Sequence, residues 1–169
     1  MIAELTGEEL SKMKAFLERF DRKLFDELLG KYSLATIGEE GEKTIIVSGR
    51  ETAELAKRLS PETFGLPFGE FRFGDFYLGL EGLYLIGGMS DRKKVILDEK
   101  GVQFFLYGRD VKGKHINIYD EDLKTGDLTL VTTPYGEVIG LATVAGKLEK
   151  LGTVIHKLLD RGWYLREGG

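Results

Sequence analysis

The residues best suited to chemistry in this chain are basic side chains, most of them in its C-terminal half. Lys and Arg side chains hold phosphate groups, and nearby glycines let a phosphate chain approach the backbone N–H groups. One set surrounds a short predicted helix, and another lies near the C-terminus. The candidate binding residues are Arg92, Lys93, Lys94, Gly108, Arg109, Lys147, Lys150, Lys157, Arg161 and Arg166.

A solvated surface is the alternative interpretation of these cations. Taken singly, an exposed Lys or Arg commonly forms a surface ion pair, and only as sets do these residues indicate a binding surface. Lys100, Lys112 and Lys114, around the same predicted helix, share both interpretations. The residue types alone leave the choice open.

The distribution of charge favours the C-terminal half as the place where a polyanion would bind. The chain has a formal net charge of −4. Residues 1–91 carry 11 Lys/Arg against 17 Asp/Glu, whereas residues 92–169 carry 13 against 11. Binding of a polyanion requires a local basic patch and not a positive total.

No residue pattern predicts catalysis, a cofactor or a metal. The chain has no cysteine, and its two histidines lie far apart with no third ligand evident. The run from Asp120 to Asp127 fails as a calcium loop, because its fifth and sixth positions are Lys124 and Thr125, where an oxygen ligand and a glycine are required. We therefore expect a protein that is not an enzyme.

Aromatic residues offer a second kind of contact. Several of them alternate within residues 71–77, and Trp163 and Tyr164 lie near the C-terminus. Aromatic rings stack on unpaired bases, but alternating aromatics also build the buried face of a sheet. We interpret these residues as core.

The composition is that of a folded protein. A chain of 169 residues with 42% apolar residues can bury a core. It has no apolar run near eighteen residues and no secretory pattern, so we expect a cytoplasmic protein with no membrane partner. One Asn and one Gln, against 24 Lys/Arg and 28 Asp/Glu, are typical of a hyperthermophile protein.

The N-terminal half predicts helices and an antiparallel sheet. Apolar residues recur at three- and four-residue steps over residues 10–28, after a capping box at Thr6 and Glu9, and predict one helix that ends near residue 30. Residues 33–37 and 44–47 predict a hairpin. Another capping box, from Ser48 to Glu51, precedes a second helix. Strands are expected within residues 64–77, and residues 78–86 could form a strand or a helix.

Paired glycines at 87 and 88 suggest a boundary between two domains, 1–91 and 92–169. The second half predicts a strand over 94–98, a short helix over 101–107 with a left-handed glycine after it, and a type I turn over 133–136. A strand follows over 138–144, and residues 163–166 predict a closing strand.

The order of these elements resembles the PUA domain. The resemblance rests on the strand from Lys94, the helix that ends at Gly108, and Gly126-Asp127 entering a strand. It implies an RNA-binding β-barrel. The expected fold class is α+β, with an N-terminal α/β domain (an antiparallel sheet with helices) followed by a PUA-type β-barrel domain.

The chain as a whole is similar to the Nip-seven family of ribosome biogenesis factors. The motifs that carry this similarity are Phe68-Gly-Glu-Phe71, Gly101–Val111, Ile139-Gly140 and Asp160–Arg166. The resemblance implies a non-catalytic protein of large-subunit assembly and precursor rRNA processing. Its basic PUA half would bind ribosomal RNA or its precursor, and its N-terminal half would bind assembly or RNA-processing proteins.

Three other functions agree with parts of the sequence. Translation-initiation-type factors also join an N-terminal domain to a PUA domain. A small RNA-modifying enzyme could carry a PUA domain, but it would need a catalytic Asp and a substrate pocket within residues 1–91. A protein-interaction module without RNA function agrees with the negative net charge.

Overall fold

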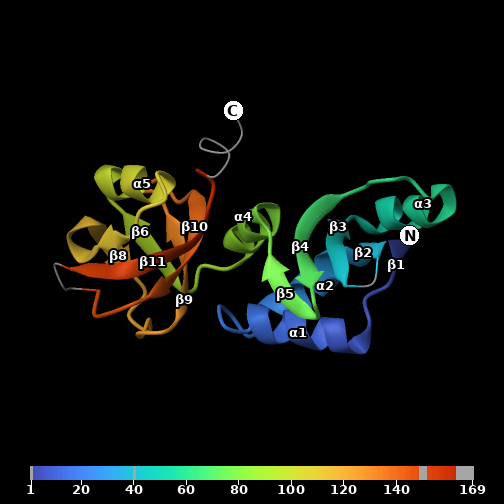
Figure 1. The fold of residues 1–169 in the computed structure, drawn as a ribbon, viewed down its shortest axis with the longest axis horizontal. Helices are drawn as coiled ribbons and strands as arrows, with labels where there is room; N and C mark the ends of the chain where they lie inside the picture. The colour runs from blue at the N-terminus through green and yellow to red at the C-terminus, as the bar shows by residue number, and fades with distance from the viewer. Residues whose placement is uncertain (1, 40, 149–151, 163–169) are drawn as a thin grey trace. The chain divides into compact units, whose positions relative to one another are not determined.

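The computed structural model describes residues 2–39, 41–148 and 152–162. The chain divides into two compact units, Met1–Ile86 and Gly87–Gly169. The first unit is an antiparallel sheet with helices, and the second is a barrel-like sheet with a helix (Figure 1). The predicted fold class is confirmed.

The first unit is built on a five-stranded sheet in which each strand pairs with its neighbour in sequence. The strands are β1 (Ile2–Ala3), β2 (Ser33–Glu39), β3 (Glu42–Ser48), β4 (Leu66–Arg72) and β5 (Asp75–Leu78), and the helices are α1 (Gly7–Leu17), α2 (Leu24–Lys31) and α3 (Arg50–Leu59). The predicted hairpin is confirmed as β2 and β3. A further helix, α4 (Leu80–Met89), contains the boundary between the units, so residues 80–86 are helical.

The prediction of a single helix over residues 10–28 is wrong, because residues 18–23 separate α1 from α2. The Asp21 carboxylate accepts a hydrogen bond from the Lys23 backbone N–H at 3.0 Å, a local contact that competes with the helical ladder. The apolar stripe nevertheless continues through the break, since Leu17, Phe20 and Leu24 are all buried. The spacing of apolar residues therefore predicted the buried positions correctly but not the break between α1 and α2.

The two capping boxes have different outcomes. At α1, Thr6 Oγ1 accepts from the Glu9 backbone N–H at 3.2 Å and Glu9 Oε2 accepts from the Thr6 N–H at 2.8 Å, which confirms the prediction. The box at Ser48 is wrong. Gly49 is the N-cap of α3, and Ser48 is the last residue of β3, where pairing within the sheet fixes its backbone.

The second unit folds around a six-stranded sheet in the order β7-β11-β10-β9-β6-β8. Its elements are β6 (Lys94–Leu97), α5 (Glu99–Leu106), β7 (Val111–Lys112), the 3-10 helix η1 (Gly113–His115), β8 (Ile116–Tyr119), β9 (Leu128–Thr132), β10 (Val138–Val144) and β11 (Thr153–Asp160). All pairs are antiparallel except β6 with β9, which is parallel. The predicted closing strand over 163–166 lies outside the described residues.

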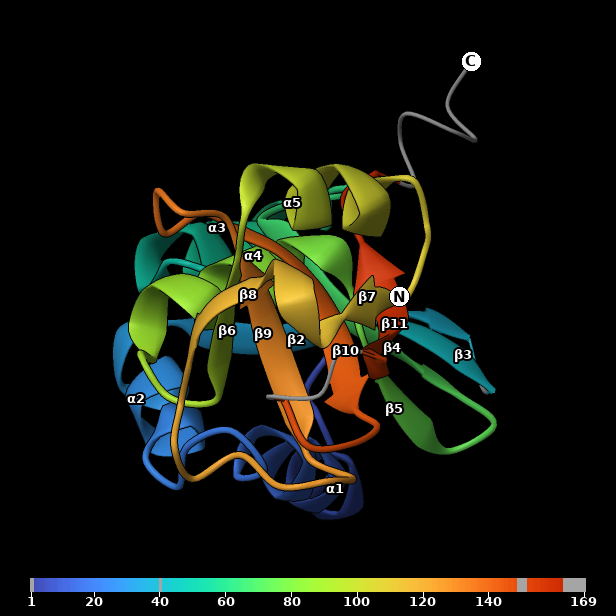
Figure 2. The ribbon, with the colours of Figure 1, turned by 90° about the vertical axis from the view of Figure 1, so that its left-hand side faces the viewer.

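One buried cluster fixes α5 on the strands of this unit. Phe105 is fully buried among residues that include Val95, Val131 and Ile155. Gly140 in β10 leaves room for its ring, because a Cβ at that position would overlap Phe105. Helix α5 thus lies across one end of the strands, with its other face exposed (Figure 2).

Candidate nucleic-acid interface

The end of α5 turns the chain back along the helix. Gly108 has a φ of +79°, the left-handed conformation predicted from its place after the helix. Its N–H donates to the Phe105 carbonyl at 2.9 Å, and the Arg109 N–H donates to the Phe104 carbonyl at 3.0 Å. Arg109 is therefore held close to the exposed face of α5.

Two cations flank one aromatic ring on this face. Lys100 Nζ lies 6.0 Å and Arg109 Cζ lies 5.8 Å from the centre of the Phe104 ring. Tyr107, one helical turn further on, is 72% exposed. We call Lys100, Phe104, Tyr107 and Arg109 the Phe104 cluster. In the described ranges, neither Lys100 nor Arg109 has a carboxylate partner, so both charges are available to a ligand.

The buried His115 and its partner Asp98 support the Phe104 ring. The His115 ring meets Phe104 edge to face at 5.3 Å, and His115 Nδ1 lies 3.1 Å from Asp98 Oδ2. Asp98 also caps α5 by accepting from the Gly101 N–H at 2.6 Å. Burial of Asp98 opposes its ionisation, but the Gly101 hydrogen bond and the His115 contact outweigh it and lower the pKa of Asp98. The helix start and the ring are thereby fixed together.

The predicted set at residues 92–94 lies elsewhere in the unit and is bound to carboxylates. The ion pairs are Arg92 Nη2 with Asp122 Oδ2 at 2.8 Å, Lys93 Nζ with Asp127 Oδ2 at 2.8 Å and with Asp122 Oδ2 at 3.6 Å, and Lys94 Nζ with Asp91 Oδ1 at 3.1 Å. The hydrogen bond from Arg92 is the main cause of the lowered pKa of Asp122. The Lys93 side chain is only 14% exposed.

The backbone of Lys93 is equally constrained. Its φ is +56°, and its N–H donates to the Asp120 carboxylate. Its carbonyl accepts from the Leu130 N–H at 2.8 Å and from Thr129 Oγ1 at 3.0 Å. Lys93 thus ties the start of β6 to the acidic segment 120–127.

The predicted residues of the C-terminal set are divided by the structure. Lys157 Nζ pairs with Asp160 Oδ2 at 3.1 Å, and Arg161 Nη1 pairs with Glu137 Oε1 at 2.5 Å. Lys147 is exposed and has no ion pair within the described ranges. Lys150 and Arg166 lie outside the described residues.

The structure therefore brings Gly108 and Arg109 together with Lys100, and it places Arg92, Lys93 and Lys94 against carboxylates. The sequence interpretation missed Phe104 and Tyr107. Their signal was present, because Lys100, Phe104 and Tyr107 are spaced by four and three residues and so share one face of a helix.

The described residues contain no group of three or more His, Cys, Asp or Glu side chains that could hold a metal ion. None of the helices described is long and apolar enough to cross a membrane.

The barrel-like sheet, the helix and its left-handed glycine define a PUA-type unit. Residues 93–169 match the UPF0113 PUA domain family, which confirms the predicted PUA domain. A UPF0113 protein of Archaeoglobus fulgidus is 28% identical over 151 residues, which cover 83% of this chain and 82% of that protein. The resemblance to the Nip-seven family is finer than this match and stays a prediction.

Solved structures support the same fold over both units. A conserved PUA domain protein from Thermoplasma acidophilum superposes with a TM-score of 0.65 at 15% identity and covers 99% of each chain. A hypothetical protein from Pyrococcus horikoshii OT3 gives a TM-score of 0.61 at 21% identity, covering 98% of this chain and 99% of that one. At such identities the similarity establishes the fold alone.

Proposed function

We propose that this chain is a non-catalytic RNA-binding protein that holds single-stranded RNA on the Phe104 cluster of its PUA-type unit. The observation that carries the proposal is the partly exposed ring of Phe104 beside two cations that have no carboxylate partner in the described residues. Proteins that bind single strands combine these two features, with cations for the phosphates and aromatic rings for the unpaired bases.

The cluster is suited to unpaired RNA for a geometric reason. The major-groove base edges of an A-form helix lie in a deep, narrow groove that side chains cannot read, whereas an unpaired base can lie flat on a ring. Tyr107, three residues further along the chain, adds an exposed ring to the partly exposed one of Phe104. The left-handed turn at Gly108 adds no side chain that would keep a phosphate away from the backbone.

The ion-paired cations are weaker candidates for the same role. A phosphate that contacts Arg92 or Arg161 must displace a carboxylate, which costs only about 0–1 kcal/mol for an exposed pair. Lys93 differs, because it bridges two carboxylates and is largely buried. We therefore assign Arg92 and Arg161 a peripheral part in RNA binding, and Lys93, with the similarly covered Lys94 and Lys157, a structural one.

The cellular role that we propose is large-subunit ribosome assembly and precursor rRNA processing, as the Nip-seven resemblance implies. The excess of acidic residues over residues 1–91 supports contacts between this half and basic assembly proteins. Co-purification separates this role from its alternatives. Recovery with large-subunit precursors supports it, recovery with mature small subunits favours a translation-initiation-type factor, and recovery of proteins without RNA favours an interaction module.

Fluorescence anisotropy with a labelled single-stranded RNA at several salt concentrations tests RNA binding directly. If four or five phosphates are neutralised, the plot of log affinity against log salt should have a slope of about −3, at ~0.7 per phosphate. A duplex of the same sequence should bind more weakly. Equal affinity for the duplex, or a slope near zero, would contradict the proposal.

A further inference from the structure

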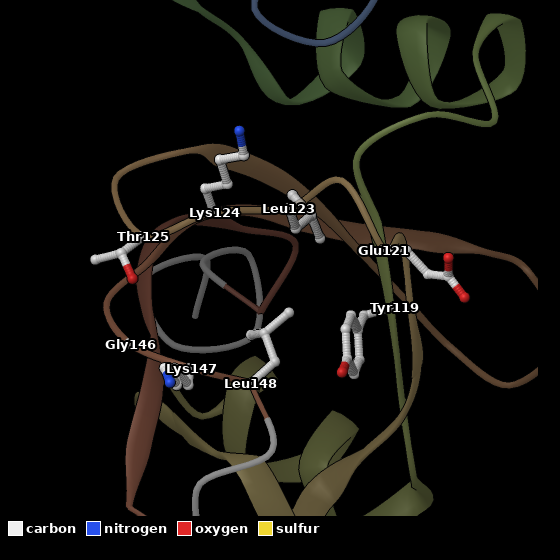
Figure 3. A pocket seen from close by; sticks show the side chains of 8 residues that line it. All are labelled: Tyr119, Glu121, Leu123, Lys124, Thr125, Gly146, Lys147 and Leu148. Carbon is white, nitrogen blue, oxygen red and sulfur yellow. The ribbon is translucent and has the colours of Figure 1, made fainter.

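A cavity of about 770 Å³ opens in the second unit between residues 119–125 and residues 146–148. In Figure 3 the side chains of Tyr119, Leu123 and Leu148 converge on its middle. Tyr119 and Leu123 are partly buried and pack against the core of the unit with their other sides. We call this cavity the Tyr119 pocket.

The rim of the Tyr119 pocket is basic. Lys124 and Lys147 line it, both are exposed, and neither forms an ion pair within the described ranges. Thr125 lies on the same side as Lys147, whereas the Lys124 ammonium group and the Glu121 carboxylate both extend away from the middle of the cavity (Figure 3). The pocket therefore combines an apolar, partly aromatic floor with a positively charged edge.

Backbone contacts hold the walls in place before any ligand arrives. The Gly126 N–H donates to the Val144 carbonyl at 2.7 Å, and the Val144 N–H donates to the Asp127 carbonyl at 2.9 Å. Lys93 Nζ donates to the Asp122 carbonyl at 3.0 Å. A pocket that is already formed loses little conformational freedom when it binds a ligand.

We propose that the Tyr119 pocket takes one unpaired nucleotide of the bound RNA, an inference that rests on the proposed RNA-binding function. The base lies against the Tyr119 ring, with Leu123 and Leu148 around it, and its phosphate lies at the rim beside Lys147. The volume falls within the usual range for small-ligand sites, about 300–1,000 Å³. A phosphate alone would leave the apolar floor uncovered, and an apolar ligand would leave Lys147 unused.

Titration of the full-length chain with AMP, CMP, GMP and UMP, followed by NMR, tests the pocket. Nucleotides should shift the resonances of Tyr119, Leu123 and Leu148 with an affinity on the order of 1 mM. Inorganic phosphate and adenosine, given separately, should each bind at least about tenfold more weakly, because each satisfies only one part of the pocket. Shifts confined to the Phe104 cluster, or equal binding of phosphate, would overturn the inference.

Two variants identify the residues. Lys147→Gln should weaken nucleotide binding about tenfold, as the loss of a charged contact does, while Lys31→Gln, a control at an exposed lysine of the first unit, should leave it unchanged. Tyr119→Leu keeps apolar volume but removes the flat ring, and it should weaken binding about tenfold as well. Because Tyr119 is partly buried, Lys147→Gln remains the deciding variant if Tyr119→Leu unfolds. Unchanged nucleotide affinity in Lys147→Gln would overturn the inference.

Anisotropy with single-stranded RNA separates the two proposals. If RNA binds the wild type, and binds Lys147→Gln and Tyr119→Leu as tightly as the wild type, the pocket inference fails and the proposed function stands. If RNA does not bind the wild type, the proposed function fails, and the nucleotide titration alone decides whether the pocket is a nucleotide site.

Discussion

The Phe104 cluster and the segment Arg92–Lys94 are both basic, yet their charges are engaged very differently. In the Phe104 cluster, the cations contact an aromatic ring, and the described residues include no carboxylate paired with them. In the segment, all three cations pair with aspartates. The density of Lys and Arg in a sequence therefore does not show which charges a ligand can use. Availability depends on the acidic residues that the fold brings to them.

The comparison predicts its largest effect for reversal of charge in the Phe104 cluster. The double variant Lys100→Glu/Arg109→Glu should weaken binding of single-stranded RNA by at least about 100-fold, because two charge-assisted contacts of about 1.5–3 kcal/mol each are lost. Lys31→Glu/Arg58→Glu changes the net charge equally at exposed sites of the first unit and serves as the control. Equal losses in both double variants, measured by anisotropy, would show that only total charge matters.

A substitution at Gly108 tests whether the left-handed turn, and not only the cations, contributes to stability and to RNA binding. Gly108→Ala places a Cβ at a φ of +79° and should destabilise the protein by about 1–2 kcal/mol in chemical denaturation. It should also weaken RNA binding, since Arg109 follows this turn. Gly88→Ala, in α4 with open space around it, should be neutral or slightly stabilising. A Gly108→Ala variant as stable as the wild type would contradict a requirement for the left-handed turn.

Lys93→Met should show the opposite balance, with a loss of stability larger than any loss of RNA affinity. The variant leaves Asp122 and Asp127 without the ammonium group between them. Because these ion pairs are intermediate between exposed and buried, we expect the free energy of unfolding to fall by about 1–2 kcal/mol. Thermal unfolding measures this loss. A variant as stable as wild type that no longer binds RNA would instead place Lys93 in the interface.

The smallest effect is expected for the carboxylate of Asp98, whose partner His115 contacts the Phe104 ring. The pKa of Asp98 is lowered in the folded protein, so its ionised form contributes stability above its unfolded pKa of about 3.8, and this contribution is lost as the pH falls through the lower folded value. Asp98→Asn should therefore flatten the fall of stability in acid titrations below about pH 4. Glu62→Gln, at an exposed site, is the control. Parallel acid curves for Asp98→Asn and wild type would contradict the prediction.

The parts of the fold that could be predicted from the sequence depend on local contacts. The capping box at Thr6, the hairpin and the left-handed Gly108 each involve residues only a few positions apart, where backbone geometry and side-chain chemistry decide the outcome. The same locality explains the error at Asp21. A contact between residues two positions apart lies in the break between α1 and α2, which the apolar spacing alone does not reveal.

The ion pairs of Arg92 and Lys93 could not be predicted because their partners are distant along the chain. Lys93 is 29 positions from Asp122 and 34 from Asp127 along the chain, and the parallel pairing of β6 with β9 brings these segments together. The acidic run was correctly set aside as a calcium loop, but its role as the partner of the basic segment needed the sheet order. The same non-local packing forms the Tyr119 pocket, whose lining comes from residues 119–125 and 146–148.

The ion pairs between Lys93 and the aspartates affect how the stability of this region depends on temperature. Hydration of charged groups becomes less favourable as temperature rises, so removing such groups from water is penalised less in hot solvent than in cold. Arg92 and Lys93 both reach Asp122, and Lys93 also reaches Asp127, which makes a small network instead of an isolated pair. The wall of the nucleotide-sized pocket is therefore fastened by the kind of interaction that loses least on warming, as suits a chain almost free of heat-labile amides.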